Sequence, residues 1–228
     1  MSNELNCKNI ILLEKLIESR FNLPLWGVSP AEPLRETINE ELISTFDRYT
    51  HAVVIGYPLS RGVLETIENS PNILYKHHYQ QVNWYLDRCA LEIATEIESH
   101  GYLAIPIPAS VITDWDCQRG HLSHRHSAVN AGLGWLGRHG LVVTEEFGAQ
   151  IRWATILTDM ELPTGTPIDG DCGSCMRCVE ACPVEAIGIS FCDVRSCYEQ
   201  LKEYSKIPGV GQLICGICIK ACSSEHNG

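Results

Sequence analysis

The sequence lacks a long hydrophobic run and a basic amino terminus, and it is poor in positive charge. No apolar stretch approaches the ~20 residues that a membrane-spanning helix needs. The first 20 residues carry acidic side chains where a secretory signal peptide has a basic start. Lys and Arg number 17 against 28 Asp and Glu, for a formal net charge of -11. We therefore expect a cytoplasmic protein with no membrane association and no general affinity for a nucleic-acid backbone.

Cysteine, by contrast, is abundant and unevenly placed. Of the twelve cysteines among 228 residues, nine follow residue 170. Cytosolic thiols stay reduced, so the pattern indicates metal ligands or catalytic thiols rather than disulfides. The stretch ELPTGTPIDGD (161–171) is rich in Pro, Gly and Thr and marks a boundary. We predict two domains, residues 1–165 and 166–228.

Apolar periodicity predicts an α/β fold for the first domain, with helices packed on a sheet. Helices are expected over 4–20, 77–99 and 121–131, the second ending at Gly101, and strands over 51–60 and 102–110. The prolines of NLPLWGVSPAEPL are expected to interrupt regular structure. The run LVVTEEFGAQIRWATILTD predicts two strands joined as a hairpin at Glu145 to Gly148.

Two cysteine motifs have the spacing of iron-sulfur ligands. The first fits CxxCxxCxxxCP, in which the fourth cysteine reaches the other cluster of a two-cluster module. The second repeats CxxCxxxC. Zinc is the alternative, but a CxxCxxC run crowds three ligands onto one turn and leaves the following Cys-Pro without a partner, which favours iron and sulfur. The motif cysteines are Cys172, Cys175, Cys178, Cys182, Cys215, Cys218 and Cys222.

The spacing predicts how these thiols divide between two 4Fe-4S clusters. One cluster is expected on Cys172, Cys175, Cys178 and Cys222, and the other on Cys182, Cys215 and Cys218. The second set lacks a ligand, and spacing does not choose between Cys192 and Cys197. Cys7, Cys89 and Cys117 are left over, and the first two are expected in the core because they fall on apolar helix faces.

The stretch AGLGWLGRHGLVV and the cysteine motifs that follow it resemble the epoxyqueuosine reductase family, and more distantly the reductive dehalogenases. The resemblance covers roughly residues 50–222. It implies a nitroreductase-like domain that holds cobalamin beside a two-cluster, ferredoxin-like module. It also implies an enzyme, a cobalamin-dependent reductase that passes electrons from the clusters to the corrinoid and then to a small substrate. The segment DVRSC resembles the family segment that supplies the missing ligand, which favours Cys197.

The same resemblance implies where the cofactor binds. The loop glycines would let the backbone approach a large flat ligand, with Leu133 and Trp135 as an apolar wall. An ordinary strand-to-helix turn that needs glycines for its backbone angles is the alternative. Further contacts are expected from the hairpin that follows. The residues are Gly132, Leu133, Gly134, Trp135, Gly137, His139, Gly148 and Arg152.

A proton donor is expected at His124, where the family carries an acidic residue eight positions before the first loop glycine. Tyr57 is a second candidate. His121, His124 and His126 could instead be surface residues at a helix start. A metal site built from these three histidines, with Asp114 and Asp116 nearby in sequence, is a further alternative, although no fourth ligand is apparent.

The expected partners are a small-molecule substrate or a redox partner protein, and a low-potential electron donor. Family members continue into helical repeats that help hold transfer RNA, whereas this chain ends six residues past Cys222. Together with the acidic charge, this leads us to expect that transfer RNA is not a partner. Two alternatives stay open: a ferredoxin-like protein that reduces a partner or its corrinoid, and a flavin in place of the corrin.

Overall fold

The computed structural model describes residues 2–115 and 118–224. Contacts divide the chain into two compact units. The first comprises Met1–Tyr57, Asn83–Leu133 and Arg152–Ile168, and the second comprises Pro58–Val82, Gly134–Ile151 and Asp169–Gly228. Residues 58–82 and 134–151 thus fold with the cysteine-rich segment, across the boundary expected near residue 165. The two-domain division itself stays a prediction.

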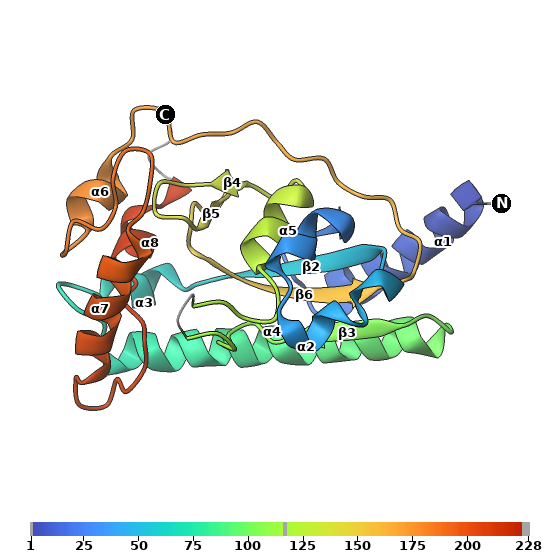
Figure 1. Cartoon of the computed structure of the whole chain (residues 1–228), viewed down its shortest axis with the longest axis horizontal. Helices are drawn as coiled ribbons and strands as arrows, with labels where there is room; N and C mark the ends of the chain where they lie inside the picture. Colours follow the sequence, from blue (N-terminus) through green and yellow to red (C-terminus); the bar gives the residue numbers. More distant parts are fainter. Residues whose placement is uncertain (1, 116–117, 225–228) are drawn as a thin grey trace. The chain divides into compact units, whose positions relative to one another are not determined.

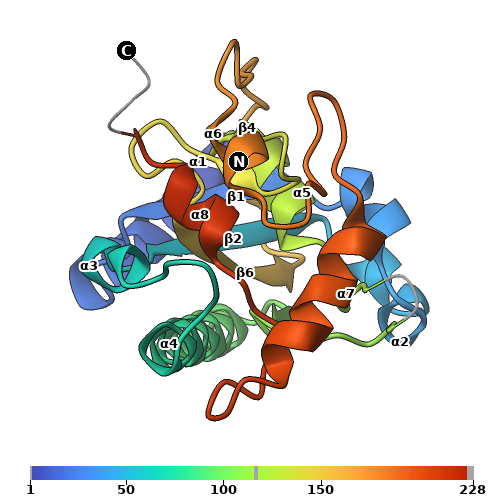
Figure 2. The ribbon, with the colours of Figure 1, turned by 90° about the vertical axis from the view of Figure 1, so that its left-hand side faces the viewer.

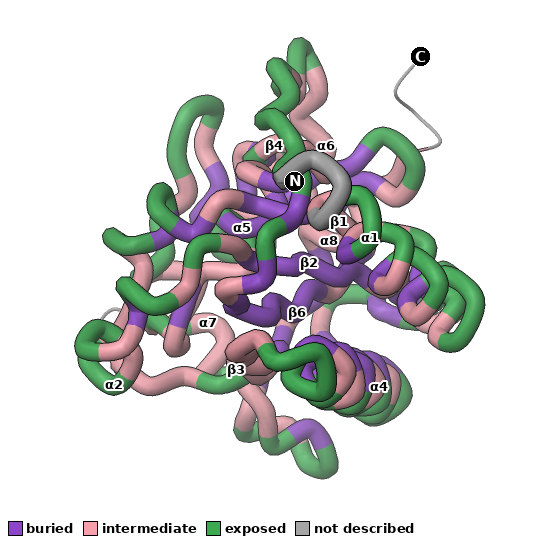
Figure 3. Tube along the Cα trace, turned by 90° about the vertical axis from the view of Figure 1, so that its right-hand side faces the viewer, coloured by how far each residue is buried: buried purple, intermediate pink, exposed green. Residues whose placement is uncertain are grey.

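A four-stranded sheet ordered β1-β2-β6-β3 is the centre of the first unit. β1 pairs antiparallel with β2, and β3 pairs antiparallel with β6. Helix α5 lies on one side of this sheet and α4 on the other (Figures 1 and 3). The elements that contribute are α1 (Ser2–Glu14), the π-helical turn η1 (Lys15–Arg20), β1 (Leu25–Pro30), the 3₁₀ turns η2 (Glu32–Thr37) and η3 (Phe46–Arg48), α2 (Glu40–Ile43), β2 (His51–Pro58), α4 (Ile73–Ser99), β3 (Ala104–Ile107), α5 (His124–Asn130) and β6 (Ile151–Thr158).

The two inner strands carry the core. Val53, Val54 and Ile55 of β2 are fully buried, as are Ala154, Ile156 and Leu157 of β6, and both strands are coloured as buried in Figure 3. Strands that are buried on both faces read as continuous apolar runs, which is why the β2 strand could be predicted. A cluster of buried side chains packs around this sheet: Ala31, Leu34, Phe46, Ala52, Ile107, Leu122 and Leu157.

Helix α4 confirms the predicted long helix and begins four residues earlier than expected. The Asn72 side chain caps its start, accepting a hydrogen bond from Tyr75 N at 2.8 Å. Gly101, with φ at +86°, follows its end as predicted. The predicted apolar face is buried, since Leu86, Ile93 and Ile97 are fully inaccessible.

The two leftover cysteines on helices have different surroundings. Cys89 of α4 is buried, as predicted. Cys7 of α1 is exposed, so its placement in the core was wrong. The buried positions of this first helical segment are Asn9, Leu13 and Ile17, four residues apart, and Cys7 lies two residues from Asn9 on another face. Cys117 lies outside the described residues.

Two predictions about strands were wrong. Residues 25–30, expected to be irregular because of their prolines, form β1. This strand is at the edge of the sheet and ends at Pro30, which is where a sheet tolerates proline. The second error is the hairpin at Glu145 to Gly148. The strand before it, β5 (Val142–Val143), pairs with β4 (Trp135–Leu136), while β6 enters the larger sheet.

The partner of β5 is set by two local turns. Gly137 N donates to Leu141 O at 2.9 Å and Gly140 has φ at +70°, so a tight turn returns the chain from β4 to β5. The segment after β5 closes on itself through reciprocal hydrogen bonds between Thr144 and Gly148. Every residue of β6 except Arg152 is buried, and its place between β2 and β3 pairs both of its edges.

The second unit is mostly helical. Besides β4 and β5 it contains α3 (Arg61–Glu65), the first part of α4, α6 (Arg177–Ala181), α7 (Val194–Ser205) and α8 (Ile217–Ala221). Helix α8 contacts both α6 and α3. The C-terminal helices α7 and α8 are drawn in orange-red and red, respectively, in Figure 2. In the described parts of the chain, no helix combines the length and the apolar character required to cross a bilayer.

We expect Gly56→Ala to destabilise the protein by about 1–3 kcal/mol through overpacking of the sheet. A methyl group at residue 56 would lie 2.6 Å from the ring of Trp153, a buried side chain that has no room to withdraw. The measurement is urea unfolding followed by circular dichroism. Gly62→Ala in α3 is the control, because the nearest atom to its new methyl group is Ser60 Oγ at 4.0 Å. Equal midpoints for the two variants would contradict this account.

Candidate functional site

The first cysteine group is formed by a loop, a short helix and the end of α8. Cys175 N donates to Cys172 O at 2.9 Å, so the CxxC segment is a tight turn that leads into α6. Cys178 lies in α6 and Cys222 is the residue that ends α8, the helix packed against α6. Burial raises the pKa of Cys222 to about 11, and the neighbouring thiols of Cys178 and Cys172 act in the same direction. These thiols therefore lie close together.

The second cysteine group comes from α7, from α8 and from the segments that follow α6 and precede α8. Burial raises the pKa of the Cys197 thiol to about 11, and the thiols of Cys192, Cys215 and Cys182 add to this effect. Burial also raises the pKa of Cys218, again with contributions from nearby thiols of this group. Cys178 of the first group contributes to Cys218 as well, so the two groups are neighbours. None of the eleven described cysteines forms a disulfide.

The chemistry of this donor set fits iron-sulfur clusters. Cluster ligands are thiolates, and thiolates gathered in one place repel one another unless positive charge is placed between them. The raised thiol pKa values express this repulsion and the cost of burial. Iron would supply the missing positive charge, and thiolate sulfur is the donor that iron-sulfur clusters use.

Two arginines that the sequence reasoning missed support the first group. Arg138 Nε donates to Cys175 O at 3.1 Å, and its Nη2 donates to Gly173 O at 2.6 Å. Its Nη1 also donates to Ile189 O, so one side chain ties the CxxC turn to the loop before α7. A hydrogen bond from the Arg177 side chain lowers the pKa of Cys175. The sequence signal for Arg177 was a basic side chain inside the first cysteine motif of an acidic protein, whereas Arg138 lies far from the motif in sequence and could not have been found in this way.

Gly148 lies against a proposed cluster ligand. A methyl group at residue 148 would meet Cys222 O at 2.2 Å, and Ala149 N donates to that same oxygen at 3.0 Å. The φ of Gly148 is +58°, which also favours glycine. The structure thus explains this glycine by its approach to the backbone of Cys222, while its predicted cofactor contact remains untested.

The glycines of the AGLGWLG loop are also explained by the chain's own packing. A methyl group at Gly132 would lie 2.5 Å from Thr166 O, and one at Gly134 would lie 2.2 Å from Val143 O. At Gly137 it would meet the side chains of Val143 and His139. Close packing accounts for these residues, whereas the backbone angles that the turn alternative expected are found only at Gly132, with φ at +74°. Their contact with a cofactor stays a prediction.

Three other residues of the predicted cofactor set have defined surroundings. The Trp135 indole Nε1 is buried without a hydrogen-bond partner. His139 is buried, which lowers its pKa to about 4, and its Nδ1 accepts a hydrogen bond from Leu141 N at 3.1 Å. Arg152 donates through Nε to Asn83 Oδ1 at 2.9 Å and through Nη2 to Ala109 O at 3.2 Å. Leu133 is partly buried.

His124, the predicted proton donor, has both ring nitrogens engaged. Its Nε2 donates to Pro108 O at 2.9 Å, which leaves Nδ1 to accept from Thr155 Oγ1 at 2.8 Å. Burial lowers the pKa of His124 to about 4. The ring is therefore neutral at physiological pH. The second candidate, Tyr57, packs edge-on against Tyr85, with ring centroids 5.1 Å apart.

The histidines around His124 do not share a ligand site. His121 Nε2 is 2.8 Å from Glu41 Oε2, and His126 Nδ1 is 2.7 Å from Ser123 Oγ. Asp114 pairs with Arg119 through the backbone, and Asp116 lies outside the described residues. Over residues 2–115 and 118–224, no three His, Cys, Asp or Glu side chains form a group that could hold a single metal ion.

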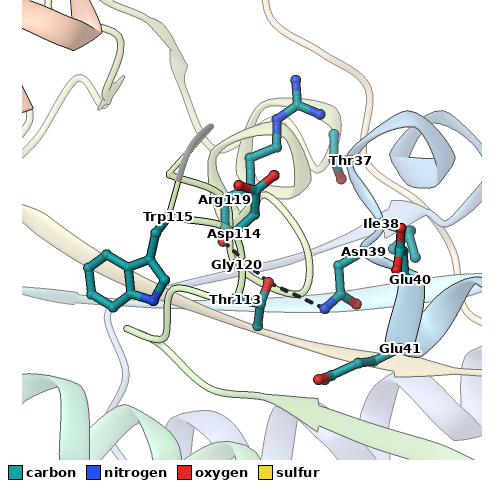
Figure 4. A pocket seen from close by; sticks show the side chains of 10 residues that line it. All are labelled: Thr37, Ile38, Asn39, Glu40, Glu41, Thr113, Asp114, Trp115, Arg119 and Gly120. Atoms are coloured by element: carbon teal, nitrogen blue, oxygen red, sulfur yellow. Dashed lines mark hydrogen bonds between the residues drawn. The ribbon is translucent and has the colours of Figure 1, made fainter.

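A cavity of about 580 Å³ opens in the first unit, and none of the predicted site residues lines it. Its middle is crossed by a hydrogen bond of 3.3 Å from Asn39 Nδ2 to Thr113 Oγ1 (Figure 4). Trp115 stands on one side of this bond, and Glu40 and Glu41 on the other. The lining is Thr37, Ile38, Asn39, Glu40, Glu41, Thr113, Asp114, Trp115, Arg119 and Gly120.

Comparison with known proteins confirms the predicted resemblance. A curated epoxyqueuosine reductase from Aliivibrio fischeri is 29% identical over 114 residues, which are 50% of this chain and 28% of that protein. Another, from Vibrio cholerae, is 29% identical over 136 residues, or 59% of this chain and 34% of that protein. The matched segments thus span about a third or less of these relatives. No family model matches the chain.

Solved structures show the fold. A catabolic reductive dehalogenase in complex with 3-bromo-4-hydroxybenzoic acid matches 88% of this chain and 29% of its own, with a TM-score of 0.68 and 20% identity. An epoxyqueuosine reductase bound to a tRNA-Tyr stem loop matches 96% of this chain and 65% of its own, with a TM-score of 0.61 and 18% identity. The chain therefore has the mixed α/β fold that these enzymes contain.

The stem-loop complex contradicts our expectation that transfer RNA is not a partner. An enzyme with this fold is solved with a tRNA stem loop bound. Net charge describes the far field of the whole chain, whereas binding depends on the local surface, so a charge of -11 does not exclude such a partner.

We expect His124 to make stability depend on pH. Its folded pKa of about 4 lies below the ordinary value of 6.5, so the unfolded chain binds the proton more tightly, and stability is lost as pH falls from 6.5 towards 4. This group should account for a loss of about 2 kcal/mol between pH 7 and pH 5. The measurement is urea unfolding of the wild type and of His124→Gln at both values.

The variant should lose clearly less stability than the wild type over this interval, because Gln does not titrate. His100→Gln is the control, since His100 lies exposed near the end of α4. An unchanged pH dependence in His124→Gln would show that the histidine is not held neutral.

Proposed function

We propose that this chain is an iron-sulfur oxidoreductase of the epoxyqueuosine reductase type, in which two 4Fe-4S clusters pass electrons to a bound cobalamin and from there to a substrate. The premise is the resemblance to curated epoxyqueuosine reductases, together with the mixed α/β fold. The observation that carries the proposal is the gathering of eight cysteine thiols into two neighbouring groups within one compact unit.

The proposed ligands follow the two groups. Cys172, Cys175, Cys178 and Cys222 would hold one cluster, and Cys182, Cys197, Cys215 and Cys218 the other. Support comes from the mutual effects of the thiols on their pKa values. Those on Cys197 include the additional thiol of Cys192, and the remaining effects fall within these sets apart from that of Cys178 on Cys218. That one contact suits transfer of electrons between clusters, because it brings the two ligand sets side by side.

Cobalamin is proposed from the resemblance, with one supporting feature. When bound, it would supply a low-potential metal centre that can deliver electrons to a substrate. The buried Trp135 Nε1 has no partner in the protein, and a polar group of a ligand would satisfy this donor. We propose Trp135 and the neighbouring loop Gly132–Gly137, with His139, Gly148 and Arg152, as the part of the chain that holds the cofactor.

For the proton that reduction consumes, Tyr57 is the better of the two candidates. His124 would have to break its bond to Pro108 O before it could donate, and its neutral ring is a poor acid at physiological pH. We propose that His124 instead fixes the backbone at Pro108 to Thr155 on β6. The stem-loop complex of a relative makes a tRNA nucleoside the first substrate to test.

We expect protein purified without oxygen to contain about eight iron atoms and eight sulfides per chain. Cys178→Ala should lose about half of each, because a cluster with three ligands is readily lost. Cys7→Ala is the matched control and should retain the full amount, since Cys7 is exposed on α1. Iron, zinc and acid-labile sulfide are assayed chemically, with circular dichroism as a check on folding. Zinc in place of iron would overturn the proposal.

We expect cobalamin to bind the cluster-loaded protein at a stoichiometry of about one molecule per chain. The visible spectrum of the cobalamin should shift on binding. Trp135→Phe removes the indole N–H but keeps an apolar ring, and it should weaken binding up to about tenfold, the effect of one hydrogen bond. Trp84→Phe is the control, because Trp84 is exposed on α4. Full clusters without cobalamin binding would indicate a ferredoxin-like electron-transfer protein. A flavin found in the purified protein would show that the organic cofactor is a flavin and not a corrinoid.

A further inference from the structure

The cysteine-rich segment contains nine cysteines, one more than two 4Fe-4S clusters need. We propose that Cys192 is a reserve ligand of the second cluster, presented to the same corner as Cys197. This inference rests on the proposed function, because it assumes that a cluster occupies the second cysteine group.

The start of α7 brings the two thiols together. Asp193 caps this helix, since its Oδ1 accepts hydrogen bonds from Arg195 N at 3.0 Å and Ser196 N at 3.1 Å. Cys192 therefore occupies the position before the cap and Cys197 the fourth position of the helix. Side chains at these two positions pack against each other at capped helix starts. The structure agrees, because the Cys192 thiol contributes to the environment of Cys197.

Backbone pairing holds this helix start against another ligand of the same group. Cys192 and Ile187 form an antiparallel bridge, and Asp193 N donates to Ala186 O at 2.7 Å. Ala186 N in turn donates to the Cys182 sulfur at 3.3 Å. The segment after Cys182 and the segment that carries Cys192 are thus paired side by side, which holds the start of α7 next to the segment that follows a proposed ligand of the second cluster.

Of the two thiols, Cys197 is the ligand in the resting protein and Cys192 is its reserve. Cys197 lies near Cys182, Cys215 and Cys218, which complete the group. The loop that carries Cys192 has the exposed side chains Ile189 and Phe191, at 66% and 69%, so it is not held in a packed core. In an exchange, Cys192 loses its proton to become the iron-bound thiolate and Cys197 takes one up, so the charge of the cluster is unchanged.

The test compares Cys197→Ala, Cys192→Ala and the double variant, each loaded with iron and sulfide without oxygen. Cys192→Ala should keep about eight iron atoms. Cys197→Ala should also keep about eight, whereas the double variant should fall to about four because no thiol is left at this corner. Cys218→Ala is the control for a ligand without a reserve and should likewise fall to about four.

A second measurement identifies the thiol itself. Holoproteins are treated with iodoacetamide, and the peptide that contains residues 192 and 197 is analysed by mass spectrometry. In the wild type Cys192 should be alkylated and Cys197 protected, and in Cys197→Ala the remaining Cys192 should become protected. An alkylated Cys192 in Cys197→Ala, or a loss of half its iron, overturns the inference.

The outcomes separate this inference from the proposed function. If the wild type itself holds no clusters, the proposed function fails. If the wild type and Cys192→Ala hold about eight iron atoms and Cys197→Ala holds about four, the clusters stand and only the reserve ligand is refuted. Retention of about eight iron atoms in the double variant also refutes it, because some other group, such as the Asp193 carboxylate, would then supply the ligand.

Discussion

Mutual repulsion among buried thiolates is the constraint on which the second unit depends. Eight cysteines converge there, and burial raises the pKa of most of them because a thiolate out of water needs a compensating charge. The protein supplies only part of this positive charge. Arg177 lies beside Cys175, and Arg138 donates to the carbonyl oxygens of the same turn. Iron would supply the rest. With the proposed clusters bound, the fold of this unit would depend on them in the way that small metal-binding domains depend on their metal.

Close packing of the chain against itself is a second constraint, and it gives the glycines a structural reason that does not involve a ligand. From the sequence, the glycines of AGLGWLG and Gly148 were candidates for contact with a flat ligand. In the structure each has the chain's own atoms where a side chain would be, and at Gly148 those atoms are the backbone of Cys222. A glycine that admits a ligand and one that admits the protein's own backbone have the same sequence signature, so only the tertiary contacts distinguish them.

What the sequence predicted well was local or strongly periodic. The face of α4, the buried β2 strand and the stop at Gly101 follow from apolar spacing and from one residue's backbone freedom. What it missed depends on partners far along the chain. The edge strand β1 exists because β2 pairs with it, and β5 pairs with β4 because a turn at Gly140 competes with the predicted hairpin. The division of the cysteines between two clusters follows from the spacing of their motifs and stays a prediction.

The catalytic role predicted for His124 stays a prediction, whereas the expectation about transfer RNA was wrong, and both depend on local surroundings that the sequence does not specify. His124 was chosen for its position in a motif, yet the chemistry of an imidazole is set by its surroundings, and here Pro108 and Thr155 occupy both nitrogens. Net charge likewise sums the whole chain and says little about any one surface. The cavity lined by Glu40, Glu41 and Asp114, with Arg119 beside them, is more acidic than basic and therefore a poor place for a phosphate. Amino-acid composition describes the average charge and polarity of the whole chain, whereas a functional site depends on the burial and charge around a few residues.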